Sequence, residues 1–213
     1  MKLTLLGAPG AGKGTQAAEL EKEYNIPAIS TGQIIREAIA AKTALGNEVK
    51  TYIDRGELVP DDIVVEMVKE RVKDDDCKFG YILDGFPRTI SQAETMEKLL
   101  ILVDCALEID VDEDIIVDRL SGRRVCSSCG ATYHITGNPS KKEGVCDKCG
   151  STLKVRDDDV PDVIRHRLKV YSEQTKPLKD FYDARGKLIT VKGQDKVEDT
   201  TRAIMKALKD IEA

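Results

Sequence analysis

A glycine-rich loop that contains a lysine lies near the start of the chain, and its residue types suit phosphate binding. Residues 7–15 read GAPGAGKGT and stand between an apolar run and a helical pattern. Glycines let backbone N–H groups approach phosphate oxygens, the helix start adds unpaired donors, and Lys13 adds a full positive charge. The loop matches the phosphate-binding pattern G-x-x-x-x-G-K-[ST] except at the end, where Gly14 precedes Thr15. This agreement favours a nucleotide-phosphate site over an ordinary glycine-rich turn, and it leaves direct binding of Mg²⁺ by Thr15 open.

Four of the six cysteines form two C-x-x-C pairs, each followed by a glycine, with sixteen residues between the pairs. This spacing is typical of a structural zinc site with four thiolate ligands. Two disulfides and a nucleic-acid-binding zinc ribbon are the alternatives, and iron or cobalt also suits four thiolates. His134 could replace one ligand, but we expect it to be a surface or packing residue. The expected ligands are Cys126, Cys129, Cys146 and Cys149.

Arginines and carboxylates stand beside the positions expected to hold phosphate. The run DGFPR, from Asp84 to Arg88, directly follows a predicted strand, and ligands of open α/β sheets bind at the carboxyl ends of strands. Asp84 could orient Mg²⁺ or its water shell, and Arg88 could clamp a phosphate. Arginines and acids also flank the cysteine-rich stretch at both ends, as expected of a lid that closes over a charged substrate. A solvated charged face is the alternative for any one of them.

The composition is that of a globular protein with one sizeable core: 213 residues, 41% hydrophobic and 33% charged. A net charge of −5 and the absence of Trp argue against a nucleic-acid partner. No apolar run approaches the length that crosses a membrane, and the N-terminal residues do not have the pattern of a signal peptide. We therefore expect a cytoplasmic protein without membrane association.

Short apolar runs alternate with helical patterns along most of the chain, which predicts an α/β fold with a parallel sheet. The expected strands are 2–6, 27–29, 80–84, 103–109 and 187–191. The expected helices are 13–23, 32–41, 44–55, 61–73, 89–100, 113–120, 160–184 and 197–211. Thr31 is expected to cap the helix that follows it, and Cys77 and Cys105 are expected to be buried or half-buried thiols.

Taken in order, these motifs resemble the adenylate kinase family, and more narrowly its long-lid members with a zinc-binding lid. The resemblance covers essentially the whole chain. It rests on GAPGAGKGT, STGQIIR at 30–36, DGFPR at 84–88, Gln92, GRR at 122–124, the two cysteine pairs, RDDD at 156–159 and RHRL at 165–168. It implies a P-loop nucleoside-monophosphate kinase fold, with a five-stranded parallel sheet flanked by helices. The implied parts are a core (1–29, 60–121 and 160–213), an AMP-binding segment (30–59) and a zinc-binding lid (122–159).

The resemblance implies the reversible reaction ATP + AMP = 2 ADP with Mg²⁺, carried out by a monomer that maintains the balance of adenine nucleotides. The residues implied in catalysis are Lys13, Asp84, Arg88, Arg123, Arg156 and Arg167. The implied ATP contacts are Gly10, Ala11, Gly12, Lys13, Gly14, Thr15, Arg119, Arg123, Thr132 and Tyr133. The implied AMP contacts are Thr31, Arg36, Glu57, Val59, Gly85, Arg88, Gln92, Arg156 and Arg167. Asp158 and Asp159 are implied to be acids at the lid hinge.

Two positions depart from the family pattern. Gln33 stands where the family usually has Asp, which removes one acid near the expected metal, and Ser140 replaces the second proline of an Asn-Pro-Pro run. A UMP or CMP kinase, an NTP-gated nucleic-acid-binding protein and a plain NTPase are the competing interpretations. The long zinc-bearing lid and Gln92 favour AMP as the acceptor.

Overall fold

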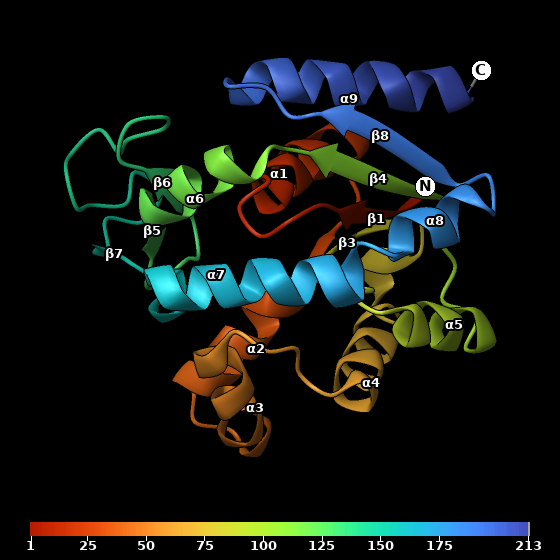
Figure 1. Cartoon of the computed structure of the whole chain (residues 1–213), viewed down its shortest axis with the longest axis horizontal. Helices are drawn as coiled ribbons and strands as arrows, with labels where there is room; N and C mark the ends of the chain where they lie inside the picture. The colour runs from red at the N-terminus through yellow and green to blue at the C-terminus, as the bar shows by residue number, and fades with distance from the viewer. Residues whose placement is uncertain (213) are drawn as a thin grey trace.

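A five-stranded parallel sheet forms the centre of the computed structural model, which describes residues 1–212 (Figure 1). Its strands lie in the order β2-β3-β1-β4-β8. Their bounds are β1 (Lys2–Leu6), β2 (Ala28–Ser30), β3 (Tyr81–Asp84), β4 (Cys105–Asp110) and β8 (Leu188–Lys192). The predicted α/β class and the five-stranded parallel sheet are confirmed, and Cys77 and Cys105 are buried as expected.

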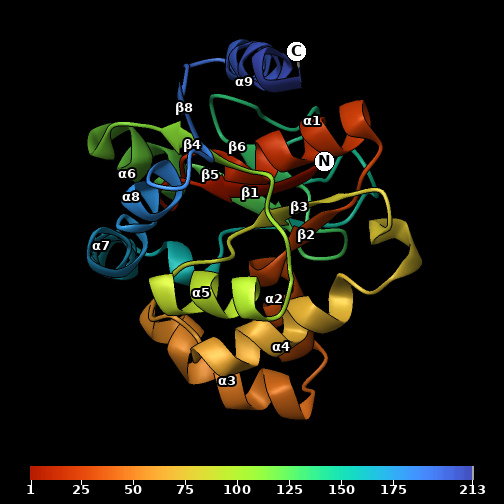
Figure 2. The same ribbon diagram turned by 90° about the vertical axis from the view of Figure 1, so that its right-hand side faces the viewer.

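Alternate residues of the central strands face two separate hydrophobic cores, because successive side chains of a strand point to opposite faces. In β3, Ile82 packs with the core beneath α1 (Lys13–Tyr24) and α9 (Val197–Glu212), whereas Tyr81 and Leu83 pack with the opposite core. The helices of that opposite core include α4 (Asp61–Arg71), α5 (Ile90–Lys98) and α8 (Leu178–Asp183). Figure 2 shows α1 and α9 on one side of the sheet and α4 and α5 on the other. Burial on both faces explains why the strands are nearly continuous apolar runs.

Two helices between β2 and α4 form a hairpin, α2 (Thr31–Ala40) and α3 (Ala44–Arg55), below the sheet in Figure 1. The side chain of Thr43 caps α3 by accepting a hydrogen bond from the Gly46 backbone N–H at 3.0 Å. Gly46 leaves room for the backbone of Ala38, which a Cβ at that position would overlap. The hairpin is therefore closely packed at its turn.

A second, antiparallel sheet lies apart from the first, at the left of Figure 1. It consists of β5 (Arg123–Cys126), β6 (Thr132–His134) and β7 (Leu153–Lys154), in the order β6-β5-β7. It follows α6 (Glu113–Ser121) and precedes a 3₁₀ turn, η2 (Asp157–Asp159). The break in the α/β pattern was visible in the sequence, whereas these three strands were not predicted.

Two local predictions are wrong. The helix expected over 160–184 is interrupted: α7 (Pro161–Val170) leads into a π-helical turn, η3 (Tyr171–Thr175), before α8 begins. Pro177 has no N–H to continue the hydrogen-bond ladder, and the Lys176 N–H instead bonds the Tyr171 carbonyl five residues back at 2.8 Å. Thr31 is not an N-cap, because α2 begins at Thr31 itself and its hydroxyl donates to the Gly85 carbonyl at 3.0 Å.

Among the described residues, no helix combines the length and the apolar character needed to cross a membrane.

Candidate active site

The glycine-rich loop joins β1 to α1, as the sequence predicts. Gly10 and Gly12 have φ angles of +86° and +100°, a region that side-chain-bearing residues rarely adopt. A Cβ at Gly12 would meet nothing within 4 Å, so this glycine serves the backbone turn and leaves the space before it open. No side chain caps the start of α1, and its N–H groups are available to an anion. The Lys13 ammonium donates to the carbonyls of Gly7 at 2.7 Å and Ala8 at 2.9 Å, so it lies folded over the loop.

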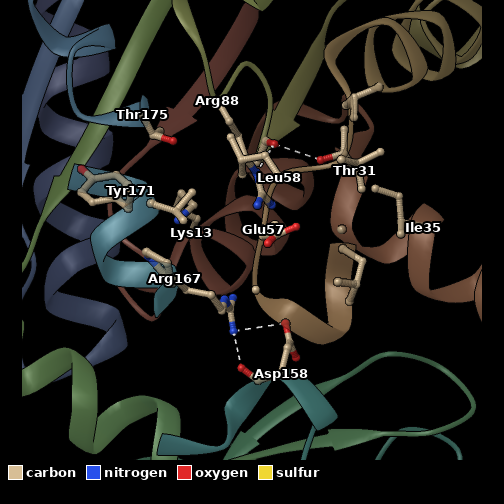
Figure 3. A pocket seen from close by; sticks show the side chains of 18 of the residues that line it. Lys13, Thr31, Ile35, Glu57, Leu58, Arg88, Asp158, Arg167, Tyr171 and Thr175 are labelled. Atoms are coloured by element: carbon tan, nitrogen blue, oxygen red, sulfur yellow. Dashed lines mark hydrogen bonds and ion pairs between the residues drawn. The ribbon is translucent and has the colours of Figure 1, made fainter. Parts of the chain in front are cut away.

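Two cavities meet beside this loop. The first, seen in Figure 3, lies toward α2, α3 and η3, and among its lining residues are Thr31, Glu57, Val59, Gly85, Gln92, Tyr171 and Thr175. The second lies toward α6 and β6, and among its lining residues are Gly10, Ala11, Gly12, Gly14, Thr15, Asp84, Arg119, Arg123, Thr132 and Tyr133. The cationic side chains that line both cavities are Lys13, Arg36, Arg88, Arg156 and Arg167. We call these five the shared cationic wall. It brings together four parts of the chain that are distant in sequence: Lys13, Arg36, Arg88 and the stretch that carries Arg156 and Arg167.

The shared cationic wall is electrostatically costly without an anion. The pKa of Lys13 is lowered to about 8, chiefly by burial; Asp84 opposes this shift, and the positive charges of Arg88 and Arg167 add to it. Burial and Arg156 lower the pKa of Arg36 to about 9, and burial also lowers that of Arg88. Across the described residues, no carboxylate comes within 4.0 Å of the charged groups of these three side chains. Desolvated, unpaired cations of this kind bind phosphate oxygens strongly.

Two buried carboxylates hold the remaining arginines in place. Asp159, whose side chain is 0% exposed, accepts a hydrogen bond from Arg123 Nε at 2.7 Å and forms a second ion pair with Arg167 at 3.1 Å. Asp158 accepts from Arg156 Nε at 2.8 Å and lies 3.1 Å from Arg167 Nη1. Burial alone would raise the pKa of Asp158, but Arg167 and Arg156 outweigh it and lower the pKa to about 2. The turn η2 thus fixes three arginines at the edge of the cavities, as Figure 3 shows for Arg167.

Asp84 lies at the carboxyl end of β3, opposite Leu5 in the register of β1 and β3. A Cβ at Gly14 would stand 3.3 Å from its Oδ2 atom. Glycine at this position therefore lets the carboxylate approach the start of α1. This contact gives a physical reason for the one departure of the loop from the general phosphate-binding pattern.

The first cavity depends on a hydrogen-bond network that the sequence only partly indicated. The Gln92 side chain is buried; its Oε1 accepts from the Arg88 backbone N–H at 2.7 Å and its Nε2 donates to Asp61 at 2.7 Å. Asp61 also accepts from the Thr89 hydroxyl at 2.9 Å. Sequence reasoning missed Asp61, because an acid in the first turn of a helix is common for reasons of the helix dipole alone. It also missed Tyr171 and Thr175, which the unpredicted π-helical turn places along the cavity.

The second cavity has a wall formed by the loop after β8, which sequence reasoning missed. Arg119 Nη2 donates to the Gln194 carbonyl at 2.9 Å, and the Gln194 N–H donates to the Thr200 hydroxyl at 2.9 Å. Tyr133 lines the same cavity, but its hydroxyl accepts from the Asp147 N–H at 2.8 Å and lies 3.5 Å from Cys146 Sγ. The tyrosine hydroxyl therefore belongs to the cysteine cluster.

The four paired cysteines converge on one point of the small sheet. The sulfur atoms of Cys126, Cys129, Cys146 and Cys149 all lie within 4.8 Å of one another. Zn–S bonds of about 2.3 Å in tetrahedral geometry require sulfur atoms about 3.8 Å apart, and the structure has 3.4 Å and 3.6 Å for two of the pairs. Backbone N–H groups of Ser128 and Cys129 point at the Cys126 sulfur, and the Tyr133 hydroxyl lowers the pKa of Cys146 to about 6. These residues fit a thiolate-bound metal such as zinc.

Comparison with known proteins gives the same assignment as the motifs. The family model described as adenylate kinase matches residues 5–187. The chain belongs to the adenylate kinase family. It is 51% identical over 212 residues to the adenylate kinase of Caldicellulosiruptor saccharolyticus, covering 98% of this chain and 99% of the relative. It is 52% identical over 212 residues to that of Lachnospira eligens and 48% identical over 212 residues to that of Staphylococcus aureus, again across 98% of this chain.

As a member of the adenylate kinase family, the chain is a nucleoside-monophosphate kinase with a four-cysteine cluster in its second sheet. Each residue that the sequence assigned to ATP lines the second cavity, and each residue assigned to AMP lines the first. Their individual roles stay predictions. His134, expected to be a surface or packing residue, is half-buried and lies outside the cysteine cluster.

Proposed function

We propose that the protein catalyses the reversible, Mg²⁺-dependent reaction ATP + AMP = 2 ADP and so maintains the balance of adenine nucleotides. The observation that carries the proposal is the meeting of two cavities at one cationic wall. Phosphoryl transfer between two nucleotides needs a site for each, with their phosphates in line and their charge compensated. A plain NTPase would need only one such cavity.

In this proposal the glycine-rich loop binds the ATP phosphates through its N–H groups and Lys13, and Arg36 with Arg88 holds the AMP phosphate. Arg123, Arg156 and Arg167 compensate the negative charge that develops on the transferred group. Mg²⁺, when bound with ATP, supplies further charge compensation, and Asp84 is the carboxylate placed to orient its water shell. The remaining task of the protein is to exclude water.

Water exclusion is proposed to come from the segments 30–59 and 122–159, which would close on the core of 1–29, 60–121 and 160–213. The shared cationic wall supports this proposed closure, since the first segment contributes Arg36 and the second contributes Arg156. Closure then completes the catalytic set only when both nucleotides are present, which limits hydrolysis. The protein is proposed to act as a monomer.

We further propose that the four cysteines hold a structural Zn²⁺. Four thiolates close the coordination sphere, and the apolar residues packed with them are few: Tyr133, Ala131 and Leu153. Metal binding would therefore supply much of the folding free energy of this small sheet. Unpaired thiols across the described residues also suit a reducing compartment, such as the cytoplasm. Elemental analysis of the purified protein tests the metal, with iron or cobalt as the competing outcomes.

The reaction itself is tested by a coupled assay that supplies ATP and Mg²⁺ with AMP, GMP, CMP or UMP. We expect ADP formation with AMP and much slower turnover with the other three. Faster turnover with UMP or CMP would assign the acceptor differently, and no ADP with any monophosphate would refute the kinase. Omission of Mg²⁺ in a parallel reaction tests the metal requirement.

A further inference from the structure

His134, at the end of β6, makes an unusual set of contacts that the proposed reaction does not use. Its Nδ1 atom accepts from the backbone N–H groups of Thr136 at 3.2 Å and Gly137 at 3.0 Å, and it lies 3.1 Å from the Thr136 hydroxyl. Since Nδ1 accepts, the ring proton sits on Nε2, which lies 3.4 Å from the Asp118 carbonyl. One imidazole therefore joins the loop after β6 to the last turn of α6.

Gly122 lies against this ring and leaves space for it. Gly122 has a φ of −83°, an ordinary conformation that any residue adopts, so its backbone does not require glycine. A Cβ at this position would overlap the Nε2, Cε1 and Cδ2 atoms of His134. The Ile135 N–H also donates to the Gly122 carbonyl at 3.0 Å. The imidazole ring occupies the space that a side chain at position 122 would fill.

The neighbours of these contact points are Arg119 and Arg123, the two arginines that line the second cavity and not the first. Arg119 follows Asp118 and Arg123 follows Gly122, and Arg123 is paired with His134 in the register of β5 and β6. His134 itself lines the second cavity, together with Gly137 and Asn138 from the loop that it bonds. The ring thus contacts residues adjacent to both arginines and the loop that lines the same cavity.

We propose that His134 is a positioning residue for the donor nucleotide: its Nδ1 acceptor fixes the loop 135–138 and the spacing of Arg119 and Arg123, and thereby sets the affinity for ATP. This inference rests on the proposed function, since it takes the second cavity as the ATP site. A change at His134 should therefore affect the binding of ATP and not that of AMP, because none of residues 135–138 lines the first cavity. The acceptor, rather than the bulk of the ring, is the essential feature.

Two substitutions separate the acceptor from the bulk. His134→Leu keeps a large side chain but removes Nδ1, and His134→Asn restores an oxygen acceptor that bonds the N–H groups two and three residues on. Binding of ATP alone, measured by calorimetry on the metal-loaded full chain, is expected to weaken about tenfold in the Leu variant. The Asn variant is expected to stay within about threefold of wild type. AMP binding is expected to change less than twofold in both.

Controls make each outcome decisive. His166→Leu replaces the other histidine, which is exposed, and is expected to leave both affinities unchanged. Unchanged ATP binding in His134→Leu, equal loss in the Leu and Asn variants, or a parallel loss of AMP binding would each overturn the inference. The metal content and melting temperature identify a variant whose lid has unfolded. If wild type itself does not bind ATP, the proposed function fails; if wild type binds ATP and the variants bind it equally, only the positioning role fails.

Gly122→Ala provides an independent measurement. Its added Cβ is expected to displace the ring and weaken ATP binding about tenfold in the wild-type background. In the His134→Asn background, where the side chain is shorter, the same substitution is expected to cost less than threefold. Equal losses in the two backgrounds would show that Gly122 acts without His134 and would refute the coupling.

Discussion

Replacing Asp159 with Asn isolates the contribution of one buried charge to the stability of the active site. The carboxylate is 0% exposed, bonds Arg123 through both of its oxygens, and lies 3.1 Å from Arg167. Both arginine side chains are 16% exposed. The substitution keeps the size of the side chain and one acceptor oxygen but removes the charge. It leaves Arg123 without a carboxylate partner among the described residues, and it leaves Arg167 with Asp158 as its only ion-pair partner there.

The expected cost follows from these contacts. Breaking a buried ion pair costs about 3–5 kcal/mol, and the partial exposure of the arginines together with the retained oxygen favours the lower end. We therefore expect a loss of about 3 kcal/mol in the free energy of unfolding. For a chain of this length that corresponds to a fall in melting temperature of about 6–12 °C. Raising the salt concentration should change the difference little, because buried pairs are screened weakly.

The assay is chemical and thermal unfolding without nucleotide, and the matched control is Asp157→Asn. Asp157 is exposed and forms no ion pair in the described part of the chain, so its substitution is expected to cost less than about 0.5 kcal/mol. If the Asp159 and Asp157 variants unfold within about 1 kcal/mol of each other, the network does not stabilise the fold and the reasoning is refuted.

Three further predictions concern the same site. Arg88→Ala removes an unpaired cation of the shared cationic wall, so turnover should fall about 10²–10³-fold with no loss of melting temperature; unchanged turnover would place Arg88 outside the site. The pKa of Asp158, about 2 against an ordinary 3.8, lies below its unfolded value. It should therefore contribute about 2 kcal/mol that is present above about pH 4 and lost as the pH falls toward 2; a difference between wild type and Asp158→Asn that does not shrink over this range contradicts it. Removing the metal with a chelator should lower the stability of residues 123–154 more than that of the core, and calorimetry that detects no loss would reject the structural-zinc assignment.

Local sequence patterns predicted those features that depend on nearby residues. The phosphate-binding loop is encoded by glycines that allow its backbone angles and by a lysine one residue beyond Gly12, all within nine positions. The two cysteine pairs are equally local, and their convergence within 4.8 Å follows from the short chain between them. The alternation of strands and helices predicted the sheet, because apolar strands covered on both faces are nearly continuous runs.

Features that depend on packing between distant segments were predicted poorly. Helical periodicity ran through 160–184, yet the chain forms a π-helical turn at Tyr171–Thr175, which brings two side chains to the first cavity. Thr31 has the residue type of a cap, but a carbonyl 54 positions away takes its hydroxyl. The sequence around Asp61 indicated only the start of a helix, although its carboxylate accepts a hydrogen bond from the Gln92 side chain. For Thr31 and Asp61, a partner remote in sequence outweighs the local preference.

By itself, the sequence predicted a nucleotide-phosphate site and a four-thiolate metal site, because the backbone angles of glycine and the ligand chemistry of cysteine act over a few residues. The tertiary structure decided how the charges are distributed. The shared cationic wall forms only when four separated parts of the chain fold against each other, and only burial makes its positive charges costly without an anion. Likewise, His134 is an ordinary residue of a short strand until folding places its ring over Gly122.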